Sequence, residues 1–294
     1  MRNYHTPVMV AEVIDGLRVE AGKRFVDATL GGGGHTVEIL RLGGRVLGID
    51  ADFDAVAYTK ERLKMELPET KEGTDWRLEK GNFRDIERIA EAEGFTGVSG
   101  VLLDLGVSSR QLDSVAKGFS YRFLEAPLDM RFDREAGVAA ADFVNSATEE
   151  ELYEAITKFG EEERAGAIVH ALVRARQIKK IQTAGDMVGA VKRAVGDNKE
   201  TSGVLSRVFQ ALRIQTNDEL SSLREGLEGA RHILKPGGRL AVISFHSLED
   251  RTVKQHMNGN GWKRITRRPL TATGSERDAN SRSRSAKLRI AEKI

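Results

Sequence analysis

Hydrophobic positions in the first third of the chain predict strands and helices in alternation. Short apolar runs typical of buried strands occupy residues 24–30, 45–50 and 98–106, and the last of these is almost continuously apolar. Apolar residues at helical spacing separate these runs over residues 35–42 and 54–67. This alternation predicts a parallel sheet with helices on both of its faces.

The pattern becomes purely helical in the middle of the chain. Between residues 114 and 215 we find helical periodicity and no convincing strand. One predicted helix, residues 147–160, starts at Thr148 and carries Glu151 three residues later, which is the spacing of a capping box. Thr183 is placed to cap a later helix. Residues 114–215 are therefore predicted to form an all-helical inserted domain.

Sheet signals return in the last third of the chain. An amphipathic helix over residues 217–234 ends in "KPGG", a turn signal, and a buried strand over residues 239–245 follows. Alternating apolar positions over residues 285–294 suit a closing, half-buried strand. The predicted fold class is α/β, with a discontinuous sheet domain of residues 1–113 and 216–294.

Composition excludes several kinds of chemistry. The chain of 294 residues has 40% hydrophobic residues and no cysteine. It can therefore form no disulfide, thiolate zinc site, iron–sulfur cluster or cysteine nucleophile. No apolar run approaches the about 18–20 residues of a membrane span, and the N-terminus lacks the order of a signal peptide. We expect a cytoplasmic protein without a membrane partner and without a metal site.

Charge is unevenly distributed along the chain. The formal net charge is +2, but the segment from Lys254 onward holds eleven basic and three acidic residues. Such a basic end favours a polyanionic partner such as RNA, although a solubilising tail gives the same composition. Candidate phosphate-binding residues lie in this end and in the predicted insertion: Arg264, Arg267, Arg268, Arg282, Arg284, Arg289, Arg174, Arg176, Lys179 and Lys180.

Four consecutive glycines, Gly31 to Gly34, follow the first predicted strand. A P-loop needs a lysine after its last glycine, but His35 and Thr36 follow here, so a triphosphate site is excluded. A dinucleotide site needs G-x-G-x-x-G, which this run matches only in part because Val37 falls near the third glycine position. A tight turn without a ligand is the structural alternative.

Acidic residues end three predicted strands, and they favour S-adenosylmethionine over a dinucleotide as the cofactor. Asp27, Asp50 and Asp104 should meet at one edge of a parallel sheet, because the carboxyl ends of adjacent strands line one crevice. Three carboxylates repel pyrophosphate but suit the ammonium, sulfonium and ribose hydroxyls of S-adenosylmethionine. Since pyrimidine C5 methylation and radical methylation need cysteine or a cluster, the methyl acceptor should be nitrogen or oxygen.

Long sequence blocks resemble one family almost from end to end. The blocks "HTPVMVAEVIDGL", "VDATLGGGGH", "LLDLGVSSRQLD", "GFSYRFLEAPLDMR", "FQALRIQTNDEL" and "GGRLAVISFHSLEDR" are similar to the ribosomal RNA small subunit methyltransferase H (MraW) family. The resemblance implies a Rossmann-like S-adenosylmethionine-dependent methyltransferase sheet with an inserted helical domain. We expect this insertion to recognise RNA through its basic residues, with a solvated helix face as the alternative. The resemblance also implies methylation of the exocyclic N4 of a cytidine in the decoding region of 16S rRNA, with S-adenosylhomocysteine as product and the small ribosomal subunit as partner.

The same resemblance assigns site residues. The implied cofactor-binding residues are Gly33, Gly34, His35, Asp50, Phe83, Asp104 and Gln111. The chain departs from the family pattern at residues 203–207 ("GVLSR") and at Ser281, both outside the cofactor blocks.

A catalytic hypothesis follows from the chemistry of the acceptor. The exocyclic amine of cytosine is a poor nucleophile, so an acceptor for its proton should assist methyl transfer. Asp104 is the candidate acceptor, with Ser108 or Ser109 nearby in sequence; a role in binding the cofactor alone is the alternative for Asp104. His246 is a second candidate for relaying the proton or binding the base, and His5 for closing over the site; packing roles are the alternative for both histidines.

Two other functions stay open from sequence alone. The first is a nicotinamide-dependent oxidoreductase, and the second an RNA-binding assembly factor with a vestigial pocket. The oligomeric state, including a homodimer, is likewise open.

Overall fold

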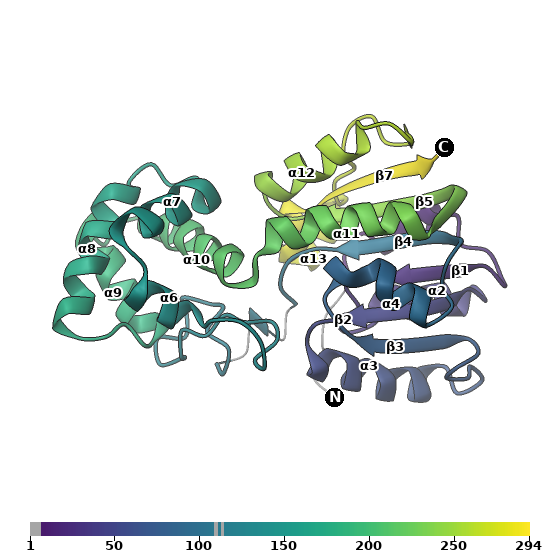
Figure 1. Ribbon diagram of the computed structural model, residues 1–294, viewed down its shortest axis with the longest axis horizontal. Helices are drawn as coiled ribbons and strands as arrows, with labels where there is room; N and C mark the ends of the chain where they lie inside the picture. Colours follow the sequence, from purple (N-terminus) through teal and green to yellow (C-terminus); the bar gives the residue numbers. More distant parts are fainter. Residues whose placement is uncertain (1–6, 109–110, 113–114) are drawn as a thin grey trace. The chain divides into compact units, whose positions relative to one another are not determined.

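The computed structural model describes residues 7–108, 111–112 and 115–294 and is shown in Figure 1. The described chain divides into two compact units: a sheet unit (Met1–Ser108 with Leu220–Ile294) and a helical unit (Ser109–Glu219). The insertion predicted at residues 114–215 lies inside the helical unit. His5 and Ser109 lie outside the described residues.

The described residues of the sheet unit form a sheet of seven strands in the order β3-β2-β1-β4-β5-β7-β6. Strands β1 to β5 are parallel, and β7 runs antiparallel to both β5 and β6. The order of β3 to β5 is that of doubly wound folds, which confirms the predicted α/β, Rossmann-like class. The strands are β1 (Arg24–Asp27), β2 (Arg45–Asp50), β3 (Trp76–Lys80), β4 (Val98–Asp104), β5 (Leu234–Ser244), β6 (Trp262–Arg264) and β7 (Lys287–Lys293).

Helices cover both faces of this sheet. Along β4, Val101 and Leu103 join the core beneath α4, α11 and α12, whereas Leu102 joins the core beneath α1, α2 and α3. This strand alternates between two buried faces, which explains its continuous apolar sequence. The helices of this unit are α1 (Val10–Leu17), α2 (Gly34–Arg41), α3 (Phe53–Glu66), η1 (Phe83–Asp85), α4 (Ile86–Ala92), α11 (Glu219–Ile233), α12 (Ser247–Met257), α13 (Gly274–Ala279) and η2 (Ser281–Ser285).

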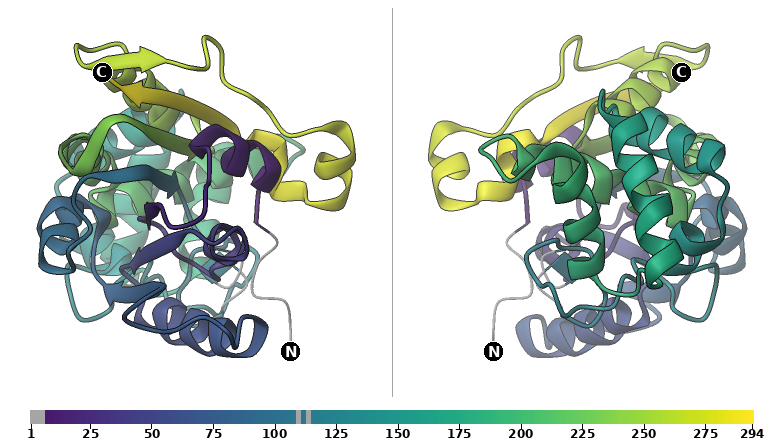
Figure 2. Two further views of the ribbon diagram at one scale, coloured as in Figure 1. Left: turned by 90° about the vertical axis from the view of Figure 1, so that its right-hand side faces the viewer. Right: turned by 90° about the vertical axis from the view of Figure 1, so that its left-hand side faces the viewer.

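The helical unit, seen in teal and green in Figure 2, packs its helices around their own apolar faces. The expected capping box at Thr148 and Glu151 is present, and Thr183 caps its helix together with Asp186. The helices are α6 (Ala140–Ser146), α7 (Glu149–Gly160), α8 (Ala165–Ile178), α9 (Ala184–Val195) and α10 (Thr201–Asn217). Nowhere in the described chain does a helix combine the length and apolarity needed to cross a membrane.

Irregular pairing accounts for one difference from the sequence-based expectation. We expected a turn at "KPGG" and then a strand, but β5 begins before the turn, at Leu234. Its pairing with β4 jumps from Val98–Leu234 to Gly100–Arg239. The turn is therefore accommodated as a bulge within β5, with Gly237 at φ 76°.

Candidate cofactor site and catalytic carboxylate

The sheet has its topological switch point between β1 and β4, where ligands bind in doubly wound folds. Asp27, Asp50 and Asp104 end the adjacent strands β1, β2 and β4. All three carboxyls therefore lie at the carboxyl edge of the sheet, as the sequence predicts.

The glycine turn between β1 and α2 is packed tightly against the rest of the sheet unit. Gly33 caps α2 at φ 71°, and a Cβ there would lie 2.4 Å from Thr59 Cγ2. A Cβ on Gly34 would lie 2.7 Å from the Pro7 ring. The glycines are thus required by the packing of this chain itself, and they leave backbone N–H groups at the start of α2, where an anion is favoured.

Asp50 is held by two backbone donors. The N–H groups of Gly31 and Asp52 donate to its Oδ2 and Oδ1, at 2.7 and 2.8 Å. Burial nevertheless raises the pKa of Asp50 to about 6. Because each carboxylate oxygen has a second lone pair, both oxygens can still accept a hydrogen bond from a hydroxyl group.

Asp27 is the most deeply buried of the three acids. Thr36 Oγ1 donates to its Oδ2 at 2.7 Å, and burial raises the pKa of this carboxyl as well. The charge of Asp27 also raises the pKa of Asp50 and of Asp104. The three carboxyls therefore form one electrostatically coupled cluster.

Asp104 is positioned at its backbone and has a free acceptor atom. Its N–H donates to Thr29 Oγ1 at 2.6 Å. Its Oδ1 is buried and has no hydrogen-bond partner among the described residues. A buried acceptor without a donor is costly, so this oxygen is available to a ligand or substrate donor.

His35 lies on the other side of the same carboxyl. Its Nε2 donates to Val8 O at 2.9 Å, and its Nδ1 lies 3.8 Å from Asp104 Oδ2. Burial raises the pKa of Asp104 to about 7, with smaller effects from His35, which lowers it, and from Asp27 and Glu249, which raise it. Near neutral pH this carboxyl can therefore exchange a proton.

His246 forms the N-terminal cap of α12. Its Nδ1 accepts from the N–H of Glu249 at 3.4 Å, and its Nε2 lies 3.1 Å from Glu249 Oε1. Glu249 Oε2 in turn accepts from the N–H of Phe245 at 2.8 Å. Both ring nitrogens thus face one residue in a capping box, and a catalytic role for His246 stays a prediction.

The other two expected cofactor contacts lie in different units. Phe83 lies in η1 and packs against the buried core of the sheet unit; a Cβ on Gly226 would lie 2.7 Å from its ring. Gln111 belongs to the helical unit and is buried. Their contacts with a cofactor stay predictions.

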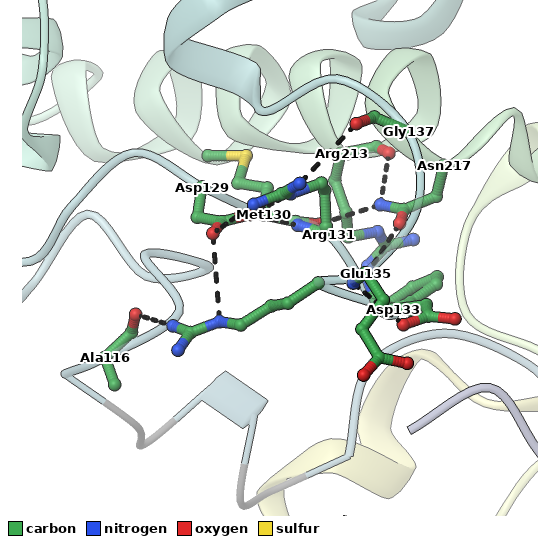
Figure 3. A network of polar contacts seen from close by, with 11 residues as sticks. Ala116, Asp129, Met130, Arg131, Asp133, Glu135, Gly137, Arg213 and Asn217 are labelled. Carbon is green, nitrogen blue, oxygen red and sulfur yellow. Dashed lines mark hydrogen bonds and ion pairs between the residues drawn. The ribbon is translucent and has the colours of Figure 1, made fainter. Parts of the chain in front are cut away.

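A polar network in the helical unit fixes the "LDMRFD" block to the end of α10 (Figure 3). Arg131 donates to both oxygens of Asp129, at 2.8 and 3.1 Å. Asn217 Nδ2 donates to Met130 O at 2.8 Å, and Asn217 Oδ1 accepts from the N–H of Phe132 at 2.9 Å. The network holds Met130 in a left-handed conformation, φ 60°, which is strained for a residue with a side chain.

Comparison with known proteins decides the family. The model of the MraW methylase family matches residues 2–294. The chain is 46% identical to the ribosomal RNA small subunit methyltransferase H of Deinococcus deserti, over 99% of this chain and 93% of that protein. It is 45% identical to the protein of the same name from Deinococcus radiodurans, over 98% and 89%. The chain belongs to the MraW methylase family.

A solved structure of an rRNA methylase from Streptococcus thermophilus aligns with a TM-score of 0.47 and 12% identity, covering 96% of this chain and 95% of that one.

The acid cluster of this methylase fits the donor of its family, S-adenosylmethionine. A positively charged sulfonium and ammonium are stabilised by nearby carboxylates, and they lower the pKa values that burial has raised. The unpartnered Oδ1 of Asp104 and the remaining lone pairs of Asp50 offer acceptors for hydroxyl or ammonium protons.

Several of the expected RNA-binding residues have partners within the described part of the methylase. Arg264 donates to Asn258 Oδ1 at 3.0 Å, and Arg284 donates to Arg277 O at 3.2 Å. Arg289 is buried and paired with both oxygens of Asp250, at 2.7 and 3.1 Å. Arg176 donates to two main-chain carbonyls near the end of α6, and Lys179 pairs with Asp186 at 3.0 Å.

Sequence reasoning assigned no site role to the two threonines, and it interpreted Glu249 only as part of a helix start with a local ion pair. Thr29 and Thr36 flank the glycine turn and bind Asp104 and Asp27. Glu249 lies two residues into α12. The sequence does show a threonine on either side of the glycines. Which aspartate each threonine contacts depends on strand register, which the sequence does not reveal.

Proposed function

We propose that this methylase transfers the methyl group of S-adenosylmethionine to the exocyclic N4 of a cytidine in the decoding region of 16S rRNA. We also propose that it acts in the cytoplasm, on the small ribosomal subunit. The names of its relatives support rRNA as the substrate. The absence of cysteine supports an acceptor that attacks directly, such as an amine nitrogen.

Four of the expected residues would hold the donor. Asp50 would accept hydrogen bonds from the ribose hydroxyls, and the main chain at Gly33 and Gly34, held in place by packing against Thr59 and Pro7, would line the donor site. His35 would complete this wall of the site. When bound, S-adenosylmethionine supplies an electrophilic methyl group.

Asp104 carries the proposed chemistry. Its buried Oδ1 lacks a protein donor and would accept a hydrogen bond from the amine of cytosine. This hydrogen bond draws electron density toward the nitrogen, and the carboxylate takes the proton as the nitrogen becomes positively charged. Burial raises the pKa of this carboxyl to about 7 in the donor-free protein, and the positive charge of a bound donor would lower that pKa and favour the ionised form that accepts the proton.

Thr29 and His35 would be positioning residues for Asp104. Thr29 holds its main chain, while the His35 ring faces Oδ2 and leaves Oδ1 to the substrate. The single observation that carries the proposal is this free, buried carboxylate oxygen beside the acid cluster.

We further propose that the helical insertion, residues 114–215, recognises RNA. Arg174 on α8 and Lys180, two residues beyond its end, are exposed and have no acidic partner within the described ranges. Exposed, unpaired cations are suited to phosphate contacts.

The test is mass spectrometry of 16S rRNA nucleosides from cells of the source organism that lack the gene. The proposal predicts loss of N4-methylcytidine, its return with the wild-type gene, and no return with an Asp104→Asn variant. Unchanged N4-methylcytidine in the deletion strain would overturn the proposal. Full restoration of N4-methylcytidine by the Asp104→Asn variant would show that Asp104 is not the proton acceptor and that another group accepts the proton.

A further inference from the structure

The edge of the sheet farthest from β3 carries a run of positive charge. Residues 254–271 contain five basic residues and no acidic one, in a chain whose basic and acidic residues otherwise nearly balance. All five basic side chains are exposed. We call residues 263–270, which comprise most of β6 and the chain that follows it, the basic edge segment.

The four basic residues of this segment fall into two groups, those with a side-chain partner and those without an acidic one. Lys263 lies 3.7 Å from Glu292, and Arg264 donates to Asn258 Oδ1 at 3.0 Å. Arg267 and Arg268 have no acidic partner within the part of the chain that the structure describes. These two guanidinium groups are therefore available to an external anion.

Backbone hydrogen bonds anchor the chain on both sides of these two arginines. The N–H groups of Ile265 and Thr266 both donate to Ile290 O, at 3.0 and 3.2 Å. Leu270 and Leu288 exchange two hydrogen bonds of 2.9 Å. Four residue steps separate Thr266 from Leu270, but only two separate their partners Ile290 and Leu288 on β7. The extra residues, 267–269, therefore bulge from the edge. Pro269, which lacks an N–H, suits such a bulge.

Strand register places this bulge near the catalytic edge of the sheet. Asp104 pairs with Ile243, Ile243 with Leu288, and Leu288 with Leu270. Three strand spacings separate Asp104 from Leu270 along this row, a distance of about 14 Å. Figure 2 shows the segment following the sheet edge toward α13.

We propose that the basic edge segment, through Arg267 and Arg268, binds RNA phosphates that flank the target nucleotide. The inference rests on the proposed rRNA substrate. Single-stranded RNA that presents a base at Asp104 has its neighbouring nucleotides within the about 14 Å that separate the two sites. Exposed cations on an edge strand also block sheet-to-sheet aggregation, and this simpler role predicts no effect on RNA binding.

The experiment compares two double variants that each remove two positive charges. Arg267→Gln/Arg268→Gln changes the bulge, whereas Lys23→Gln/Arg45→Gln changes exposed cations at the opposite, amino ends of β1 and β2. Binding to small ribosomal subunits from the deletion strain is measured over a range of salt concentrations. Calorimetry with S-adenosylmethionine confirms that each variant folds.

The bulge variant is expected to bind subunits roughly tenfold to thirtyfold more weakly at about 0.15 M salt, with a salt slope smaller by about 1.4–1.8. The control variant should match the wild type. Equal weakening in both variants, no change in the bulge variant, or weakening with an unchanged salt slope would each overturn the inference. If the wild type neither binds nor methylates these subunits, the proposed function itself fails and this inference with it.

Discussion

At the residue scale, the account depends on carboxyl groups that the fold buries together. Burial raises the pKa of Asp50 to about 6 and that of Asp104 to about 7, and it also raises the pKa of Asp27. Holding these groups ionised costs the donor-free protein stability. A positively charged donor bound beside them, as we propose, would offset that cost.

This cost predicts a pH-dependent effect of Asp104→Asn on the stability of the donor-free protein. A carboxyl whose pKa is raised on folding favours the folded state below its unfolded pKa, and this contribution is lost as pH rises through about 7. The variant should exceed the wild type in unfolding free energy by roughly 2–4 kcal/mol near about pH 8, and by much less near about pH 5. Denaturant titrations at both pH values measure the difference; a gap that does not change with pH contradicts the raised pKa.

At the element scale, the turn between β1 and α2 combines backbone strain with close packing. Gly33→Ala must adopt φ 71° and bring its Cβ to 2.4 Å from Thr59 Cγ2. Gly73→Ala is a matched control, because Gly73 has φ 85° but nothing within 4 Å of an added Cβ. We expect the first variant to lose roughly 1–3 kcal/mol more than the second, and to bind S-adenosylmethionine more weakly.

Chemical denaturation and calorimetry measure the two effects. Equal losses in the two glycine variants would mean that Thr59 moves aside and that close packing does not maintain the turn.

The start of α12 provides a second prediction at this scale. Because His246 acts as a cap, His246→Asn should keep most of the stability, whereas His246→Ala should lose about 1 kcal/mol. Asparagine can cap a helix but cannot relay a proton as imidazole does. The rate of methyl transfer by the Asn variant therefore distinguishes a capping role of His246 from a catalytic one. Near-wild-type transfer supports the cap; a loss of about a hundredfold or more in a stable variant makes His246 catalytic.

At the scale of the whole molecule, sequence predicts the strands that are buried on both faces. β1, β2 and β4 are short, mainly apolar runs that each end in an aspartate, so their acids could be placed at one edge before the structure was known. β3 was missed because Arg77 and Glu79 interrupt its apolar pattern at an exposed edge, and β6 because it has only three residues.

The finer geometry depends on contacts between distant segments, which no local pattern records. The pairing of Asp104 with Thr29 spans 75 residues, and its approach to His35 joins β4 to α2. The family blocks suggested which residues matter. They did not show that one oxygen of Asp104 stays free, or that His246 caps α12.

The most direct measurement is single-turnover transfer of a labelled methyl group to small ribosomal subunits by the Asp104→Asn variant, at a donor concentration that saturates the variant. The account predicts a rate at least about a hundredfold below that of the wild type, while S-adenosylmethionine still binds. A rate within about threefold of the wild type across the pH range would contradict proton acceptance by Asp104, since general-base catalysis contributes far more than that.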